Sequence, residues 1–116
     1  MFVLSPEEMK NLDKYTIQNV GIDGLVLMEN AGKKAAEIIE LNLIEKRSPI
    51  AVICGTGNNG GDGLVIARWL HNHNYIVNCY VIGDKTKLSP SAKKNYEILD
   101  NFNCRLTFIE NRDQLE

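Results

Sequence analysis

The feature that most limits the fold of this chain is a glycine-rich run that separates a strand-like segment from a helix-like one. The run reads Gly55-Thr56-Gly57-Asn58-Asn59-Gly60-Gly61-Asp62-Gly63. Residues 49–54 before it are continuously apolar, as for a strand covered on both faces. Residues 64–70 after it carry an apolar stripe at helical spacing. The glycines allow positive φ and close approach to a ligand, and the free N–H groups of the following helix favour an anion such as a diphosphate.

After this run, segments with the apolar pattern of a strand alternate with segments that have the apolar pattern of a helix. Residues 75–82 are predicted to form a second strand, Ser89 and Pro90 open a helix that reaches about Phe102, and residues 105–109 form a third strand. Strand, helix, strand, helix, strand predicts a parallel sheet with right-handed crossovers. We therefore expect a Rossmann-like α/β fold, a three-layer αβα arrangement that corresponds to the first half of a doubly wound domain.

A sheet of three strands has a consequence for the first strand. Residues 50–54 are expected to lie centrally in a complete doubly wound sheet, yet nothing after Glu116 supplies the other side. The domain, residues 1–116, is therefore interpreted as truncated at its C-terminal side. An uncovered apolar edge invites pairing with another chain, so we expect a homodimer or self-association through this edge.

Two helices are predicted before the first strand. Ser5, Pro6 and Glu8 form a capping box for the first, and Asp23 is an N-cap type that precedes a long amphipathic helix from Leu25 to Leu43. Gly32 lies well inside this second helix, where glycine costs about 1 kcal/mol relative to alanine. An interior glycine at such a position predicts close packing of the helix backbone against another element.

Composition limits the class of function. The chain has 116 residues, 44% of them hydrophobic, and a formal charge of -2, which suits one globular domain and provides no large positive field for nucleic acid. No apolar run approaches the roughly 20 residues that a membrane helix needs, and Met1 to Pro6 contain no basic segment typical of a secretory signal. Cys54, Cys79 and Cys104 form no C-x-x-C pair, so we interpret them as reduced structural thiols in a reducing, cytoplasmic compartment.

The glycine-rich run contains more chemistry than a simple turn. Gly55-x-Gly57-x-x-Gly60 fits the dinucleotide fingerprint, and Asp84 follows the second strand near the usual place of a ribose-binding acid. A tight turn made of small polar residues is the structural alternative. The asparagines and the aspartate exceed what an ordinary Rossmann turn needs, and they indicate polar recognition or a hard-cation site built from oxygens.

Two segments resemble a known family. The run from Cys54 to Arg68 is similar to the signature of the YjeF N-terminal domain, and Leu27-Met28-Glu29-Asn30-Ala31-Gly32 resembles the second signature of that family. The resemblance extends from Met9 to about Glu110. Active members are NAD(P)H-hydrate epimerases, which interconvert the R and S forms of NADH and NADPH hydrated at the nicotinamide ring. The resemblance therefore implies this activity in nicotinamide nucleotide repair.

The same resemblance implies roles for particular residues. The positions that match the family's segment for binding the hydrated nucleotide are Asn58, Asn59, Gly60, Gly61 and Asp62. Asn59 matches a potassium ligand, so potassium is the expected cofactor. Further ligands and a substrate-contacting aspartate belong to later strands of the family, so the acid or base stays unassigned and the 116-residue chain alone is expected to be inactive. Asp62 has three possible roles: binding or loop bracing, proton transfer, or helix capping.

Two other functions remain open at this stage. Domains that resemble this one also occur as noncatalytic scaffolds in decapping-enhancer proteins, and an ordinary NAD-dependent oxidoreductase domain would share the fingerprint. Glu29 and Asn30 could border a ligand pocket, and Arg68 is interpreted as either solvent-facing or ion-paired.

Overall fold

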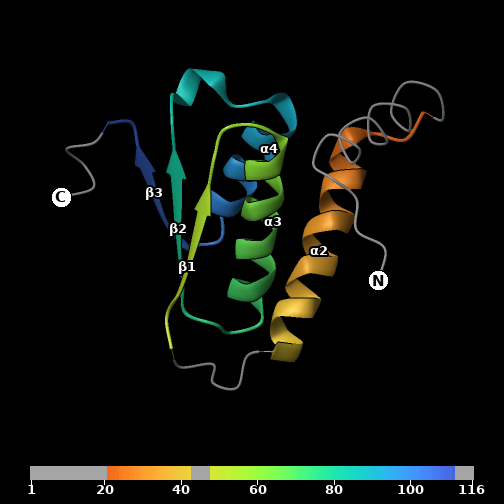
Figure 1. Ribbon diagram of the computed structural model, residues 1–116, viewed down its shortest axis with the longest axis vertical. Coiled ribbons are helices and arrows are strands. Elements are labelled where there is room, and N and C mark those ends of the chain that lie inside the picture. Colours follow the sequence, from red (N-terminus) through yellow and green to blue (C-terminus); the bar gives the residue numbers. More distant parts are fainter. Residues whose placement is uncertain (1–20, 43–47, 112–116) are drawn as a thin grey trace.

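The structure is a computed structural model that describes residues 21–42 and 48–111. Its elements in chain order are α2 (Gly24–Asn42), β1 (Ile50–Cys54), α3 (Asn58–Asn72), β2 (Val77–Ile82), the 3₁₀ helix η2 (Lys85–Lys87), α4 (Pro90–Asp100) and β3 (Arg105–Ile109). Figure 1 labels α2, α3, α4 and the three strands along the chain. The helix predicted from Ser5 lies outside the described residues.

The strands form one parallel sheet. The order is β1-β2-β3, with β1 paired to β2 and β2 paired to β3. Helices α3 and α4 lie on one side of this sheet, and α2 packs on the outside of α3 (Figure 1). The α/β class and the parallel sheet are confirmed. Of the three expected layers, the described residues supply the sheet and the helical layer on one of its faces.

The core lies between the sheet and this helical layer. Alternate side chains of β2 point into it, and Val77, Cys79 and Val81 are buried. Leu64 and Leu70 from α3 and Leu99 from α4 have no exposed surface. Full burial of a leucine of this kind contributes about 1.5–3 kcal/mol through removal of apolar area from water. The core therefore holds α3 and α4 against the sheet.

The opposite face of the sheet differs from the expectation for residues 49–54. Ala51 and Ile53 alternate with the core-facing residues of β1, and both are exposed, Ile53 to 69%. The prediction that this strand is covered on both faces is wrong for the part of the chain that the structure describes. An apolar run by itself does not distinguish a strand covered twice from one that keeps an uncovered apolar face.

The helix caps predicted at Asp23 and Ser89, and the close packing predicted at Gly32, are confirmed. The side chain of Asp23 accepts a hydrogen bond from the Leu25 N–H at 2.8 Å, and Ser89 accepts one from the Ala92 N–H at 3.2 Å. Gly32 faces α3, where an added Cβ would overlap the side chain of Val65 and lie 3.2 Å from the backbone oxygen of Asp62. The absence of a side chain lets the two helices approach at this point.

The start of α3 differs from the prediction. Residues 55–63 were expected to be a loop with the helix beginning at Leu64, but the helix begins at Asn58. Asparagine and glycine have low helix propensity, so local preference favours the loop. The helix nevertheless forms from Asn58, because its first turns pack against α2, α4 and the preceding loop. Gly60 and Gly61 are both buried by these contacts.

Candidate functional site

The candidate site lies at the carboxyl ends of β1 and β2, where ligands of open parallel sheets bind. The connections that follow these two strands contact each other there. The Ser89 N–H donates to the carbonyl of Thr56 at 3.0 Å, and the Ser89 hydroxyl donates to Oδ1 of Asn58 at 2.7 Å. The β1–α3 connection is therefore attached to the start of α4.

The predicted site residues are brought together in the first two turns of α3, but they are not equally accessible. Asn58 and Asn59 are exposed, Asp62 is half-buried, and Gly60 and Gly61 are buried. The two asparagines therefore present amide groups to solvent, whereas the two glycines contribute mainly through the space that they leave. Asp62 lies in the second turn and Gly57 is the N-cap, so the capping role considered for Asp62 is wrong.

The reason for the buried glycines also differs from the expectation. Among the described residues, positive φ occurs at Gly21, Asn74, Gly83 and Asn103, and none of these belongs to the run 55–63. A Cβ on Gly60 would overlap the backbone carbonyl of Gly55, and one on Gly61 would overlap the Met28 side chain and lie 3.3 Å from Cα of Ala92. These glycines are required by protein packing rather than by backbone conformation.

Two other glycines of the run have space around them. A Cβ on Gly55 or on Gly57 would meet no atom within 4 Å. Gly57 caps α3 without a side-chain hydrogen bond, and the first turn contains no acidic residue. The absence of a side-chain cap and of a carboxylate in this first turn favours an anion at the positive end of the helix. The place where a ligand can approach the backbone is Gly55 to Gly57, directly before the predicted segment.

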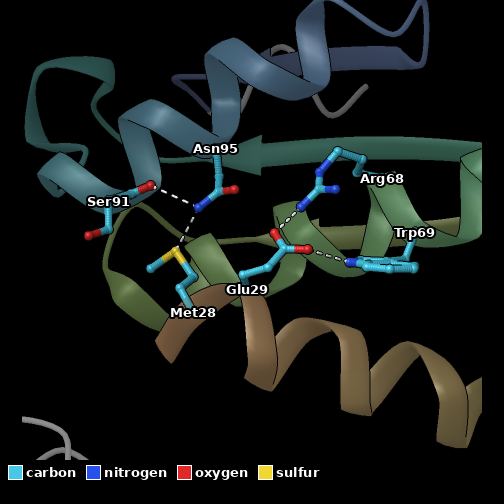
Figure 2. A network of polar contacts seen from close by, with 6 residues as sticks. All are labelled: Met28, Glu29, Arg68, Trp69, Ser91 and Asn95. Atoms are coloured by element: carbon cyan, nitrogen blue, oxygen red, sulfur yellow. Dashed lines mark hydrogen bonds and ion pairs between the residues drawn. The ribbon is translucent and has the colours of Figure 1, made fainter. Parts of the chain in front are cut away.

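A buried polar contact joins α4 to α2 (Figure 2). Asn95 on α4 is 4% exposed, and its Nδ2 donates to Sδ of Met28 at 3.0 Å and to the carbonyl of Ser91 at 3.1 Å. Met28 in turn packs against Gly61. Sequence reasoning missed Asn95, although an asparagine in the stripe Ala92, Asn95, Leu99 was an available signal.

A second polar contact in Figure 2 joins α2 to α3. The carboxylate of Glu29 forms an ion pair with Arg68 and accepts a hydrogen bond from Nε1 of Trp69 at 2.7 Å. The ion-paired alternative for Arg68 is confirmed. Glu29 therefore links α2 to α3 through its carboxylate, whereas the side chain of Asn30 is exposed.

Asp84 has a local partner. Its Oδ1 accepts hydrogen bonds from the N–H of Thr86 at 2.9 Å and from the hydroxyl of Thr86 at 2.7 Å, which caps η2. These bonds hold the pKa of Asp84 below its ordinary value of 3.8. The carboxylate that a ribose-binding role would need is engaged in this turn.

The remaining surroundings offer little for a metal. The described residues contain no group of three or more His, Cys, Asp or Glu side chains that could hold an ion. A hollow of about 250 Å³ lies beside η2 and α4 and contains none of residues 58–62; it is lined by Lys85, Thr86, Leu88, Lys93, Tyr96 and Glu97.

In the part of the chain that the structure describes, no helix has the length and apolar character to cross a membrane.

Comparison with known proteins places this geometry in a family. The sequence model of the YjeF-related protein N-terminus matches residues 24–116. The chain is 34% identical to the NAD(P)H-hydrate epimerase of Oenococcus oeni over 97% of its own length and 52% of that protein. It is 46% identical to the NAD(P)H-hydrate epimerase of Lentilactobacillus buchneri over 91% of its length and 49% of that protein.

A solved structure has the same fold. The crystal structure of the yeast protein ynu0 (YNL200c) superimposes with a TM-score of 0.80 and 28% identity, over 93% of this chain and 47% of the yeast chain. The chain thus spans about half the length of the relatives it matches. Because the matched region includes the α2 segment, the glycine-rich run and all three strands, the chain belongs to the YjeF-related protein N-terminus family.

Proposed function

We propose that this chain contributes the nucleotide-binding part of an NAD(P)H-hydrate epimerase, which interconverts the R and S forms of hydrated NADH and NADPH. The names of the relatives from Oenococcus oeni and Lentilactobacillus buchneri support the reaction. The observation that carries the proposal is the start of α3, which has no side-chain cap and exposes Asn58 and Asn59 at the carboxyl end of β1.

In this proposal the described residues bind and orient the substrate. The free end of α3 and the accessible backbone of Gly55 and Gly57 receive the diphosphate. The amide of Asn59 has both donors and an acceptor for polar groups of the nucleotide. Asp62 is a binding residue at the edge of this segment. Epimerisation at the ring requires loss and return of a hydroxyl group, and we leave its acid or base unassigned.

Potassium is part of the proposal, with Asn59 as one ligand. The exposed side chain of Asn59 can offer one amide oxygen, a donor type that hard cations accept. It stands at the positive end of α3, which by itself disfavours a cation. The described residues therefore do not make up a potassium site, and no step of the proposed reaction is derived through the ion. We expect Asn59→Ala to remove the potassium dependence of activity in the assembled enzyme, and an unchanged response to potassium would contradict the assignment.

Compartment and self-association are also proposals. The Sγ atoms of Cys54 and Cys79 lie 3.8 Å apart as free thiols; this contact lowers the pKa of Cys54, whereas the contact together with burial raises the pKa of Cys79. Both thiols are buried, which agrees with a structural role in the cytoplasm. We also propose that the chain self-associates through the uncovered edge of β1 when nothing else pairs with it.

The test measures binding of the R hydrate of NADH and of unmodified NADH to the purified chain by calorimetry, together with conversion of R to S hydrate, which we expect the chain alone not to catalyse. We expect preferential binding of the hydrate, lost in Asn59→Ala and kept in Asn72→Ala, which changes an exposed asparagine at the far end of α3. Equal affinity for NADH would favour an oxidoreductase domain. Absence of any nucleotide binding would favour a noncatalytic scaffold.

A further inference from the structure

The hydroxyl of Ser89 occupies a fixed place between the starts of α3 and α4. The Ser89 N–H donates to the carbonyl of Thr56 at 3.0 Å, and the Ser89 carbonyl accepts from the Lys93 N–H at 2.8 Å. As the N-cap of α4, its Oγ accepts from the Ala92 N–H at 3.2 Å. Hydrogen bonds to two segments of the chain therefore hold this half-buried residue in place.

The hydrogen of this hydroxyl goes to Asn58. A serine hydroxyl has one donor hydrogen and two acceptor lone pairs, and the Ala92 N–H uses one of the lone pairs. The Ser89 hydroxyl donates its hydrogen to Oδ1 of Asn58 at 2.7 Å. If the amide of Asn58 were turned over, Nδ2 would face the Ser89 Oγ and the hydroxyl hydrogen would lose this acceptor. Ser89 therefore holds the amide with its oxygen toward α4 and leaves its nitrogen free.

The free end of this amide adds hydrogen-bond donors to the start of α3. Asn58 is exposed, and its Nδ2 has no hydrogen-bond partner among the described residues. The first backbone hydrogen bond of α3 joins the Gly61 N–H to the Gly57 carbonyl at 3.0 Å, so the N–H groups of residues 58–60 have no acceptor within the helix. The side chain of Asn58 and the backbone of this turn thus offer donors in the same place.

The neighbouring asparagine is not held in this way. Asn59 is also exposed, but its side chain makes no hydrogen bond to another described residue. Its amide can therefore turn either its oxygen or its nitrogen toward a ligand. Two adjacent residues of one type thus differ in what they offer, because Asn58 is set as a donor whereas Asn59 keeps both options.

We infer that Ser89 is a positioning residue for the anion site: by holding Oδ1 of Asn58, it directs Nδ2 to an oxygen of the diphosphate of the hydrated nucleotide. The inference rests on the proposed function and adds to it the polarity of the contact at Asn58. A hydrogen bond to a charged phosphate oxygen is stronger than one to a neutral acceptor. The same arrangement disfavours a cation at Asn58, because the free end of the amide carries hydrogens rather than an oxygen.

The experiment measures binding of inorganic pyrophosphate and, separately, of the R hydrate of NADH to the purified chain by calorimetry. Ser89→Thr keeps a hydroxyl, whereas Ser89→Gly removes it and remains a fair N-cap for α4. We expect Ser89→Thr to bind within about twofold of the unaltered chain, and Ser89→Gly to bind about fivefold more weakly, because a released amide has to be ordered on binding. Ser91→Ala is the control and should leave both affinities unchanged, since the Ser91 hydroxyl makes no hydrogen bond to another described residue.

A double-mutant cycle separates positioning from a general effect on the fold. Asn58→Ala should weaken binding about tenfold, and adding Ser89→Gly should weaken it no further, because no amide remains to be oriented. If Ser89 acted only through the cap of α4, its substitution would weaken binding in both backgrounds. Additive effects, or equal binding by Ser89→Gly and Ser89→Thr, would overturn the inference.

The two ligands and an NMR readout distinguish this inference from the proposed function. The Nδ2 proton resonances of Asn58 should shift when either ligand is added. If pyrophosphate binds with the expected pattern but the chain does not prefer the hydrate to NADH, the inference is supported and the proposed function is contradicted. If the hydrate binds equally well to Asn58→Ala, the inference alone is contradicted. Binding of neither ligand would overturn both.

Discussion

The connections that follow β1 and β2 differ in how they satisfy the free N–H groups at the start of the next helix. The N-cap of α4 is Ser89, whose side chain accepts a hydrogen bond from the Ala92 N–H, and Asp84 caps η2 before it. The N-cap of α3 is Gly57, which provides no side-chain hydrogen bond. Free N–H groups of a helix need a partner, from the protein or from a ligand. The start of α4 therefore has a hydrogen-bond partner from its own chain, whereas the start of α3 remains available for an anion.

The largest expected effect comes from the packing that places α3. Gly60→Val should destabilise the fold by about 3 kcal/mol, because its side chain would overlap the Gly55 carbonyl and force the loop away from the helix. The measurement is urea denaturation followed by circular dichroism. Gly57→Ala is the control, since its Cβ would meet no atom within 4 Å, and it should cost under about 1 kcal/mol. Similar losses in both variants would mean that the two glycines are not distinguished by packing.

The buried contact between α4 and α2 comes next. Asn95→Ala should cost about 2 kcal/mol, because it leaves a gap and removes the hydrogen bonds to Met28 and Ser91. Amide exchange of residues 58–62 should also become faster, because Met28 packs on Gly61. Asn101→Ala, an exposed asparagine just after α4, is the control. Unchanged exchange in residues 58–62 would show that the contact does not hold the start of α3.

Adding a cap to α3 and removing the cap of α4 tests whether the uncapped start of α3 binds an anion. Gly57→Asp should supply the missing cap, stabilise α3 by a few tenths of a kcal/mol, and weaken binding of a dinucleotide at least about tenfold through charge repulsion. Ser89→Ala is the reverse change at α4. It should cost about 1 kcal/mol through the lost cap, together with the contact to Asn58. Calorimetric titration and thermal unfolding separate the two effects; tighter binding in Gly57→Asp would contradict an anion site at α3.

The smallest effect concerns pH. The Thr86 hydroxyl and N–H lower the pKa of Asp84 in the folded state, so the stabilisation is present above the ordinary pKa of 3.8 and is lost as the pH falls through the folded value. Thr86→Val removes the hydroxyl donor, and the pKa of Asp84 should rise toward 3.8. A carbon-detected titration of the Asp84 carboxyl measures the shift. No rise would show that the backbone N–H alone sets the value.

Much of the architecture could be predicted because local signals agree with the global fold. Asp23, Ser89 and Pro90 mark helix starts by side-chain chemistry that acts within three residues. Alternating segments of strand and helix period predict a parallel sheet because few topologies accommodate them. Residue types alone singled out the run 55–63, whereas the choice of Asn58 to Asp62 within it came from the family resemblance; the structure has this segment in the first two turns of α3.

Other features of the fold depend on contacts between residues distant in the chain. Local signals suffice to predict the order of the elements, the caps of α2 and α4 and the close packing at Gly32. The start of α3, the packing role of Gly60 and Gly61, and the burial of Asn95 were decided by neighbours that only folding brings near. The physical reason is that local propensity distinguishes conformations by less than about 1 kcal/mol per residue, whereas a steric overlap or an unpaired buried amide costs more.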